Sequence, residues 1–216
     1  MKKLILLGAG GHCESVLDSL LSAREFKDIV LVDTEEQVGK SIQGCLVVGT
    51  DEDLERLYQQ GYTYAFVSVG SIKNTLLRRS LLKKAVRNGY HMINILDPSA
   101  RVASSARLGK GVFVGKNAVV NANAVIGDMA IINTGAIVEH DCMVGEFSHI
   151  SVGAVLCGGV LIGNDCFIGA NATVLQGREI LAGNIIGAGE VVKTTKKPRG
   201  AVGGVNRNNI FYLLTG

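Results

Sequence analysis

The sequence predicts a small Rossmann-like α/β domain at the N-terminus, followed by a left-handed parallel β-helix. Three observations lead to this prediction. The 216 residues include 28 glycines but only two prolines and no tryptophan, which favours tight, regular corners over a flexible linker. Residues 1–97 alternate strand-like and helix-like segments, and from residue 102 an aliphatic residue recurs at every sixth position. We therefore expect an α/β domain over residues 1–97 and a β-helix over residues 98–216.

The first half reads as a parallel sheet with connecting helices. The expected strands cover residues 3–7, 29–32, 64–69 and 92–96, and the expected helices cover residues 14–22, 51–60 and 72–88. The last of these helices is basic and amphipathic.

A glycine-rich turn joins the first strand to the first helix. Gly8, Gly10 and Gly11 are followed by His12, and such a turn presents backbone N–H groups and a helix N-terminus to a phosphate. A complete dinucleotide fingerprint would carry glycine where this chain has Cys13, which disfavours NAD.

Two further positions belong to the same expected crevice. Asp33, followed by Thr34, ends the second strand and is placed to meet a ribose or a base edge. A turn cap is the alternative role for Asp33. Gly70 follows the third strand and would line the crevice.

The six-residue period is unbroken over fifteen positions, which at three per coil make five coils. The aliphatic side chains should point inward, and the small residue four positions later should fill the corner. We expect the glycine that often follows the aliphatic to accommodate the turn geometry. Branched aliphatic residues occupy every position of the period: Val102, Leu108, Val114, Val120, Ile126, Ile132, Val138, Val144, Ile150, Leu156, Ile162, Ile168, Val174, Ile180 and Ile186.

Composition excludes several classes of function. A net charge of +3 with dispersed basic residues is too weak to predict nucleic-acid binding. No stretch is long enough to insert into a membrane, and the apolar run after Lys3 is too short for a signal peptide. Five cysteines in an unpaired pattern indicate free thiols in a reducing compartment, so we expect a cytoplasmic protein.

Specific strings resemble the hexapeptide-repeat sugar acyltransferases, a family that includes bacillosamine N-acetyltransferases and sialic acid O-acetyltransferases. The strings are GAGGH at residues 8–12, INT at 132–134, VEHDC at 138–142, VGEFSHISVG at 144–153 and IGNDCFIGA at 162–170. The resemblance implies acetyl-CoA as co-substrate, a nucleotide-sugar substrate, and a homotrimer with active sites between subunits. It implies no metal.

His140 is the candidate general base, because histidine titrates near neutral pH and can take a proton from an attacking amine. The resemblance implies that Asp141 raises its basicity. A solvated surface pair is the alternative. For His149 the resemblance implies contact with the thioester or acyl oxygen, and a structural histidine bonded to a turn is the alternative.

Several remaining candidates follow from the resemblance, and others from the residues themselves. Gly158, Ala170 and Gly187 would let the backbone approach the CoA arm, although they could be simple corner residues. Asn133 would lie near the sugar or form a polar ladder, and Glu139 would support the base. After the last coil, relatives carry a Pro-Ala string that is absent from residues 203–208 here. The basic residues Lys196, Lys197 and Arg199 could meet CoA phosphates, and a solvated charge run is the alternative.

The implied reaction is direct N-acetylation of a nucleotide-linked amino sugar for surface glycan biosynthesis, with a UDP-4-amino-4,6-dideoxy sugar as the expected substrate. The glycine turn, which is typical of nucleotide binding, favours N-acetylation over O-acetylation of a sugar of the sialic acid type. A zinc hydratase with the same prism would need three histidines, but only His140 and His149 lie in the hexads. A non-catalytic binding scaffold is the remaining alternative.

Overall fold

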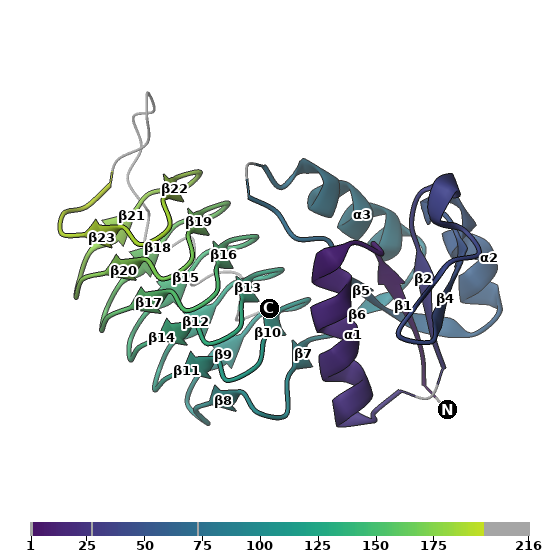
Figure 1. Ribbon diagram of the computed structural model, residues 1–216, viewed down its shortest axis with the longest axis horizontal. Helices are drawn as coiled ribbons and strands as arrows, with labels where there is room; N and C mark the ends of the chain where they lie inside the picture. The colour runs from purple at the N-terminus through teal and green to yellow at the C-terminus, as the bar shows by residue number, and fades with distance from the viewer. Residues whose placement is uncertain (1, 27, 73, 197–216) are drawn as a thin grey trace. The chain divides into compact units, whose positions relative to one another are not determined.

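The computed structural model describes residues 2–26, 28–72 and 74–196 (Figure 1). The chain divides into two compact units, one of Met1–Pro98 and a second that begins at Ser99. No helix in the described ranges has both the length and the apolar character needed to cross a membrane.

The first unit is a mostly parallel sheet with strand order β3-β4-β2-β1-β5-β6, in which only β3 is antiparallel to its neighbour. The chain builds outward from β1 in one direction and then returns to its other side, so a topological switch point lies at β1. The strands are β1 (Lys3–Leu7), β2 (Asp28–Val32), β3 (Ser41–Ile42), β4 (Cys45–Gly49), β5 (Tyr62–Val67) and β6 (His91–Met92). The helices are α1 (Gly11–Ala23), α2 (Leu54–Gln59) and α3 (Leu76–Arg87), with short 3-10 turns η1 (Glu35–Gln37) and η2 (Asp51–Asp53).

The centre of this sheet is fully apolar. Leu4, Ile5, Leu6 and Leu7 of β1 have no exposed surface, because β1 is paired on both sides, with β2 and β5. A continuous apolar run of this kind is typical of a parallel strand covered on both faces.

Several elements differ from the sequence prediction. The edge hairpin of β3 and β4 was not predicted, the expected helix 72–88 begins only at Leu76, and the expected strand 92–96 is wrong as one element. It divides into β6 and β7 (Ile95–Leu96).

The second unit is a left-handed parallel β-helix made of two-residue strands, seen as stacked coils in Figure 1. Strands eighteen residues apart pair in parallel and form three faces, which we name after their first strands in this unit. The β8 face holds β8 (Arg101–Val102), β11 (Val119–Val120), β14 (Ile137–Val138), β17 (Val155–Leu156), β20 (Thr173–Val174) and β23 (Val191–Val192). The β9 face holds β9 (Arg107–Leu108), β12 (Val125–Ile126), β15 (Met143–Val144), β18 (Leu161–Ile162) and β21 (Glu179–Ile180). The β10 face holds β10 (Phe113–Val114), β13 (Ile131–Ile132), β16 (His149–Ile150), β19 (Phe167–Ile168) and β22 (Ile185–Ile186).

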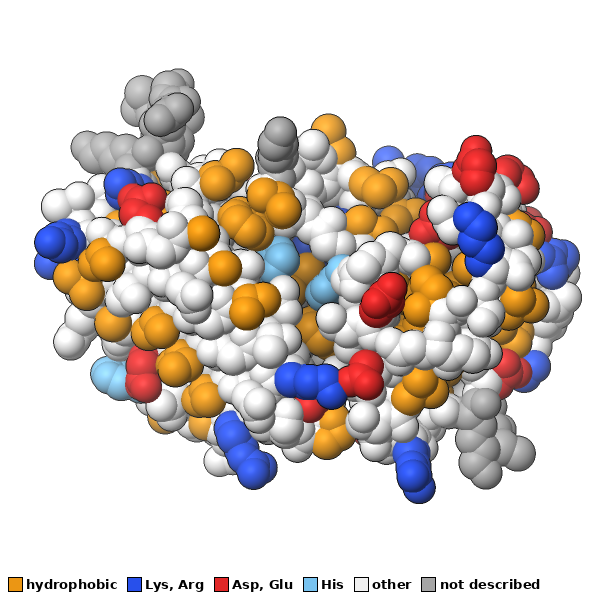
Figure 2. Space-filling model, viewed as in Figure 1, with side chains coloured by type: hydrophobic (Ala, Val, Ile, Leu, Met, Phe, Trp, Pro, Cys, Tyr) orange, Lys and Arg blue, Asp and Glu red, His pale blue; other side chains and the backbone are white. Residues whose placement is uncertain are grey.

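The predicted aliphatic ladder is the core of this unit. Ile150 has no exposed surface and stacks in register between Ile132 and Ile168. The ladder also extends one strand beyond the prediction, since Val192 is buried as well. The first residue of each strand points outward by the alternation of a strand. Many of these outward residues are apolar, and in Figure 2 apolar side chains lie scattered over the β-helix.

The corners turn at one recurrent backbone position, three residues after each inward aliphatic. From Gly111 to Gly189, every sixth residue has a φ between +53° and +73°. Glycine fills many of these left-handed positions, and asparagine or aspartate fills others, as at Asn117, Asn123 and Asp141. These residue types tolerate the left-handed region best.

The expectation that the glycine directly after the aliphatic serves the turn geometry is therefore wrong. None of these glycines has a positive φ. They are required by close stacking: a Cβ on Gly145 would lie 2.5 Å from the backbone nitrogen of Asn164 in the next coil, and Gly127, Gly163 and Gly169 meet similar crowding. Gly187, which occupies the same hexad position near the end of the prism, would meet only Glu190 Oε2 at 3.7 Å.

This difference predicts opposite outcomes for two glycine-to-alanine substitutions. Gly145→Ala should lower the free energy of unfolding by about 1–3 kcal/mol, because the next coil's backbone must move. Gly187→Ala is the matched control and should change it by less than about 0.5 kcal/mol. Chemical denaturation of both variants measures the difference, and equal stabilities would contradict the stacking explanation.

Candidate functional site

His140 lies in the corner that joins the β8 face to the β9 face, between β14 and β15. Its Nδ1 is 2.8 Å from Asp141 Oδ2, and the side chains are 55% and 57% exposed. A carboxylate can only accept a hydrogen bond, so Nδ1 carries the proton and Nε2 keeps its lone pair. The corner therefore presents an oriented imidazole whose Nε2 can accept a proton from a ligand bound at the surface of the prism.

The carboxylate sets the protonation behaviour of this histidine. The hydrogen bond to Asp141 raises the pKa of His140 above its usual value, with smaller contributions from the charges of Asp141 and Glu139. The same bond lowers the pKa of Asp141, helped by a bond from Asn123. The imidazole is thus a stronger base than an isolated histidine.

Two asparagines one coil earlier bind the two carboxylates that flank His140. Asn121 Nδ2 donates to Glu139 Oε2 at 3.1 Å, and Asn123 Nδ2 donates to Asp141 Oδ1 at 3.2 Å. Glu139 Oε2 also accepts the backbone N–H of His140 at 3.1 Å. Glu139 therefore supports the corner, in agreement with its expected role beside the base.

Gly158 lies one coil after His140 in the same corner, and the imidazole lies directly against it. A Cβ at Gly158 would be 2.6 Å from His140 Nε2 and 2.7 Å from Cε1. The corner thus has an asparagine pair on one side of the base and a glycine surface on the other. This contact gives Gly158 a role that the CoA-binding prediction did not include.

Gly158→Ala is expected to displace the imidazole and reduce kcat about tenfold or more, since a misplacement of about 1 Å can cost about 100-fold. The free energy of unfolding should change little, because the His140 ring can move into solvent. Gly159→Ala is not a suitable control because Gly159 has a φ of +68°. Gly145→Ala is the control for general coil damage, because its Cβ would crowd the Asn164 backbone and not the imidazole. An unchanged kcat in Gly158→Ala would contradict the role of Gly158 in positioning the imidazole.

His149 lies on a different part of the prism. It is the outward residue of β16, only 8% exposed, with Nε2 3.1 Å from Asn133 Nδ2 and its ring edge-to-face with Phe167 at 5.2 Å. The corner that holds His140 is opposite the β10 face in the triangular section. Within one chain, the two histidines therefore do not share a site.

The other two CoA candidates lie near His149 rather than His140. Ala170 and Gly187 belong to the corner that joins the β10 face to the β8 face, which also contains Asn133. The carbonyl oxygen of Ala170 accepts the N–H of Gly189 at 2.8 Å, and the N–H of Gly187 donates to Glu190 Oε2 at 3.2 Å. Their contact with CoA stays a prediction.

The basic tail is only partly described. Lys196 Nζ pairs with Glu190 Oε1 at 2.9 Å. Lys197, Arg199 and residues 203–208 lie outside the described residues, so the expectations placed on them stay predictions.

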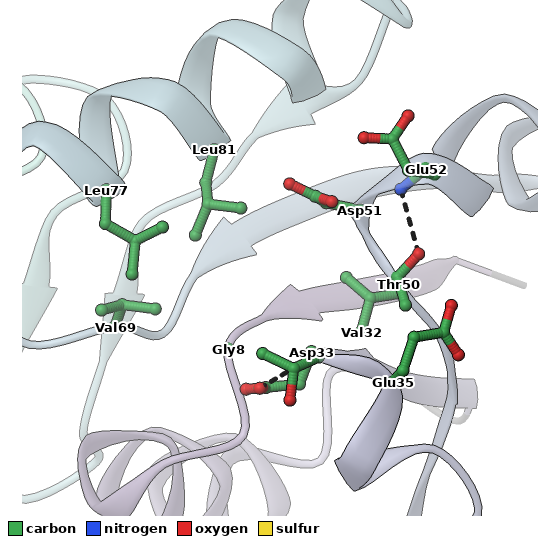
Figure 3. Close-up of a pocket in the computed structure, with 11 residues that line it drawn as sticks. Gly8, Val32, Asp33, Glu35, Thr50, Asp51, Glu52, Val69, Leu77 and Leu81 are labelled. Carbon is green, nitrogen blue, oxygen red and sulfur yellow. Dashed lines mark hydrogen bonds between the residues drawn. The ribbon is translucent and has the colours of Figure 1, made fainter.

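The first unit has a pocket of about 370 Å³ at the carboxyl ends of β1, β2 and β4 and beyond β5 (Figure 3). This is the topological switch point, where open α/β sheets bind ligands. Val69, Leu77 and Leu81 form an apolar side, and polar side chains follow β2 and β4. The lining residues are Gly8, Val32, Asp33, Thr34, Glu35, Thr50, Asp51, Glu52, Val69, Leu77 and Leu81.

Of the predicted substrate-binding residues, Asp33 and Thr34 line this pocket. Both oxygens of Asp33 accept backbone hydrogen bonds, Oδ2 from Ala9 and Oδ1 from Thr34 at 2.7 Å. Asp33 thus holds the glycine turn in place, which matches its alternative role as a turn cap. Contact with a ribose or base stays a prediction.

The other predicted residues surround the glycine turn outside the pocket lining. Gly10 is the N-cap of α1, and a Cβ on Gly10 or Gly11 would meet nothing within 4 Å. A Cβ on Gly70 would contact His12 Cβ at 3.5 Å, so these two residues are neighbours. Glycine is sterically required at Gly8, where φ is +110° and a Cβ would meet the Val69 side chain.

Three of the buried cysteines provide no activated nucleophile. All five are free thiols, and Cys157 is the one that is not buried. Burial raises the pKa of Cys13 to about 12 and of Cys142 and Cys166 to about 11. A thiol in this state is protonated at neutral pH and unreactive. In the described ranges, no group of three or more His, Cys, Asp or Glu side chains is placed to hold a metal ion.

The sequence did not reveal the contact of the imidazole with Gly158, the contacts of Asn121 and Asn123, or the pocket residues Leu77 and Leu81. The eighteen-residue offset between paired strands would have identified the first three. Residues 158, 140 and 122 occupy equivalent corner positions, and so do 141 and 123.

Comparison with known proteins identifies relatives of the same fold. Residues 3–85 match the model of the PglD N-terminal domain. PerB from Caulobacter crescentus, solved with CoA and GDP-perosamine, is 38% identical with a TM-score of 0.83, and the match covers 90% of each chain. The acetyltransferase domain of PglB from Neisseria gonorrhoeae FA1090 is 34% identical with a TM-score of 0.85, covering 93% of this chain and 95% of that one. A second structure of that domain contains acetyl coenzyme A, at 34% identity and a TM-score of 0.83, over 90% of this chain and 92% of that one.

Identity above 30% over nine-tenths of the chain, on the same two-unit architecture, leaves one assignment: the chain is an acyltransferase and belongs to the hexapeptide-repeat sugar N-acetyltransferase family.

Proposed function

We propose that the chain transfers an acetyl group from acetyl-CoA to the amino group of a nucleotide-linked sugar, with His140 as general base. One observation carries the proposal: an imidazole oriented by Asp141, with its Nε2 lone pair available, in an exposed corner of the prism. The CoA complexes of the relatives, and GDP-perosamine in PerB, support the two substrate classes.

In the proposed mechanism, the sugar amine attacks the thioester carbonyl directly. His140 Nε2 takes the amine proton as the N–C bond forms, and the tetrahedral intermediate then expels the CoA thiolate as the C–S bond breaks. The imidazolium returns the proton to the sulfur, so the base is regenerated. Asp141 stabilises the imidazolium while it exists. The high pKa values of the buried cysteines support direct transfer over an acyl-enzyme intermediate.

The pH dependence follows from the sign of the His140 shift. A base must be unprotonated, so kcat/KM should fall as the pH drops through the His140 pKa, which lies above its usual value of 6.5. Asp141→Asn removes the charge that raises this pKa. Its acid limb should move to lower pH while the plateau rate falls, because the imidazole becomes a weaker base. A pH–rate profile with an unmoved acid limb would contradict the assignment.

We place the nucleotide sugar at the switch-point pocket of the first unit. Its position beside the Asp33-anchored glycine turn supports this. The UDP-4-amino-4,6-dideoxy sugar expected from the sequence stays a prediction, and the GDP sugar bound by PerB makes GDP sugars the second group to test. Because all five cysteines are free thiols, as is usual in a reducing compartment, we propose a cytoplasmic step of surface glycan biosynthesis.

We also propose a homotrimer with active sites between subunits. His140 and His149 lie on opposite parts of one prism, so a reacting acetyl group that meets both would need a second copy. The outward row of the β8 face supports such packing, since Val119, Ile137 and Val155 are apolar and Val191 is 50% exposed. Light scattering should give three times the 22.8 kDa chain mass. A fully active monomer would contradict the proposal.

A substrate panel tests the proposed reaction. UDP-, GDP- and dTDP-linked amino sugars are incubated with acetyl-CoA, and released CoA is followed with a thiol reagent. We expect turnover with one nucleotide class and an acetamido product by mass spectrometry. Turnover only with hydroxyl acceptors such as free sialic acid would replace the proposal with sugar O-acetylation.

A further inference from the structure

This inference rests on the proposed role of His140 and concerns what orients its carboxylate partner. Asp141 uses its two oxygens differently: Oδ2 lies 2.8 Å from His140 Nδ1, and Oδ1 accepts from Asn123 Nδ2 at 3.2 Å. Asn123 lies eighteen residues earlier, at the equivalent left-handed position of the preceding coil, with φ +59°. The three side chains form a chain of hydrogen bonds that ends at the base.

The Asp141 side chain has little else to hold it. It is 57% exposed, and an exposed carboxylate can rotate freely unless both oxygens are bound. A hydrogen bond to one oxygen therefore sets the direction of the other. The contact with Asn123 directs Oδ2 toward Nδ1 and thereby selects the tautomer with the lone pair on Nε2.

The turn itself does not need the Asn123 amide. Glycine occupies the same left-handed position in other coils, as at Gly111 and Gly135. Asn117 provides an internal comparison, because it has φ +53° and its N–H donates to Ser99 Oγ at 3.0 Å, as the Asn123 N–H donates to Ser105 Oγ at 3.1 Å. The two asparagines thus share a backbone role, whereas the amide of Asn123 reaches the carboxylate beside the base.

We propose that Asn123 is a positioning residue for the acetyl transfer: its side-chain amide fixes the rotamer of Asp141 and, through it, the orientation and basicity of His140.

The charged groups that act on His140 come from its own corner. Asp141 and Glu139 both raise the pKa of His140. Asn121, Asn123 and Gly158, which contact this corner from the adjoining coils, carry no charge. A change of charge at position 123 should therefore be felt directly by the base.

Two substitutions at this position give opposite shifts. Asn123→Gly keeps the left-handed turn and removes the amide, so kcat should fall about threefold to tenfold and the acid limb of kcat/KM should move to lower pH. Asn123→Asp is nearly isosteric and adds a negative charge, so the acid limb should move to higher pH. Asn117→Gly is the matched control and should leave both kcat and the acid limb unchanged.

A measurement independent of turnover separates this inference from the proposed reaction. The His140 imidazole, with ¹⁵N label and assigned by comparison with His140→Gln, is titrated by NMR in all variants. A lower His140 pKa and a mixed tautomer in Asn123→Gly, absent from Asn117→Gly, would support the positioning role. Unchanged titration and kcat in Asn123→Gly would overturn it, as would equal losses in Asn117→Gly. Full activity of His140→Ala would instead refute the proposed base.

Discussion

Replacing His140 with Ala is expected to reduce kcat by about 10²–10⁴-fold, the usual contribution of a general base. The variant loses the imidazole of the corner. Asp141 and Glu139 do not replace it, because each stays bound to an asparagine amide and Glu139 also accepts the backbone N–H of residue 140. Initial rates of CoA release at saturating substrates measure the loss. His140→Gln should be similarly inactive, although it keeps a polar side chain of comparable length against Gly158.

Binding of CoA should survive this substitution, since the base interacts with the reacting amine rather than with the nucleotide of CoA. Calorimetry on His140→Ala should therefore give an affinity within a few-fold of the native value. His91→Ala, which removes an exposed histidine of the first unit, is the control and should keep full activity. Native turnover in His140→Ala would refute the proposed base.

The largest expected loss of stability is for Ile150→Ala, about 2–5 kcal/mol in the free energy of unfolding. Ile150 has no exposed surface and stacks between Ile132 and Ile168 on the β10 face. Each coil contacts only its neighbours, so the cavity cannot be filled by side chains from elsewhere in the prism. Chemical denaturation at a fixed chain concentration measures the change.

Ile185→Ala is the matched control for this loss. Ile185 belongs to the same face, but its side chain points outward and is 53% exposed. Its replacement should change the free energy of unfolding by less than about 0.5 kcal/mol. Similar destabilisation by the two variants would mean that the ladder is not the main source of stability.

The β-helix could be predicted almost residue by residue because its period couples side-chain direction to position. An inward aliphatic every sixth residue is compatible with only one arrangement of three flat sides and three corners. The error concerned glycine: sequence alone does not distinguish a glycine needed for a left-handed φ, such as Gly135, from one needed for close coil stacking, such as Gly145.

The first unit was harder to predict at its edges. The β3–β4 hairpin has only two paired residues on β3, and such a short segment carries no detectable period. The start of α3 at Leu76 was hidden by Ile72 and Leu76, apolar residues that extend the apparent helical pattern although they are 62% and 72% exposed.

For the site, sequence strings led to His140 and Asp141 because their chemistry is recognisable, and the structure adds their 2.8 Å contact. The separation of His149 from His140 follows from the six-residue register, because nine residues span one and a half sides of a coil. The contact of Gly158 with the imidazole depends on the rotamer of His140, which the sequence does not reveal: a Cβ at Gly158 would lie 2.6 Å from His140 Nε2.

The eighteen-residue pairing restricts which changes of length the prism can accept. An insertion of one to five residues would move later aliphatics out of the core. Six residues inserted between Asn123 and His140 would preserve every inward position, yet they would move the histidine to a different edge of the triangle and away from Asn123. An insertion of eighteen residues would return His140 to the same edge, one coil further along the prism. A change of length by six residues can therefore preserve the stability of the ladder and still abolish activity.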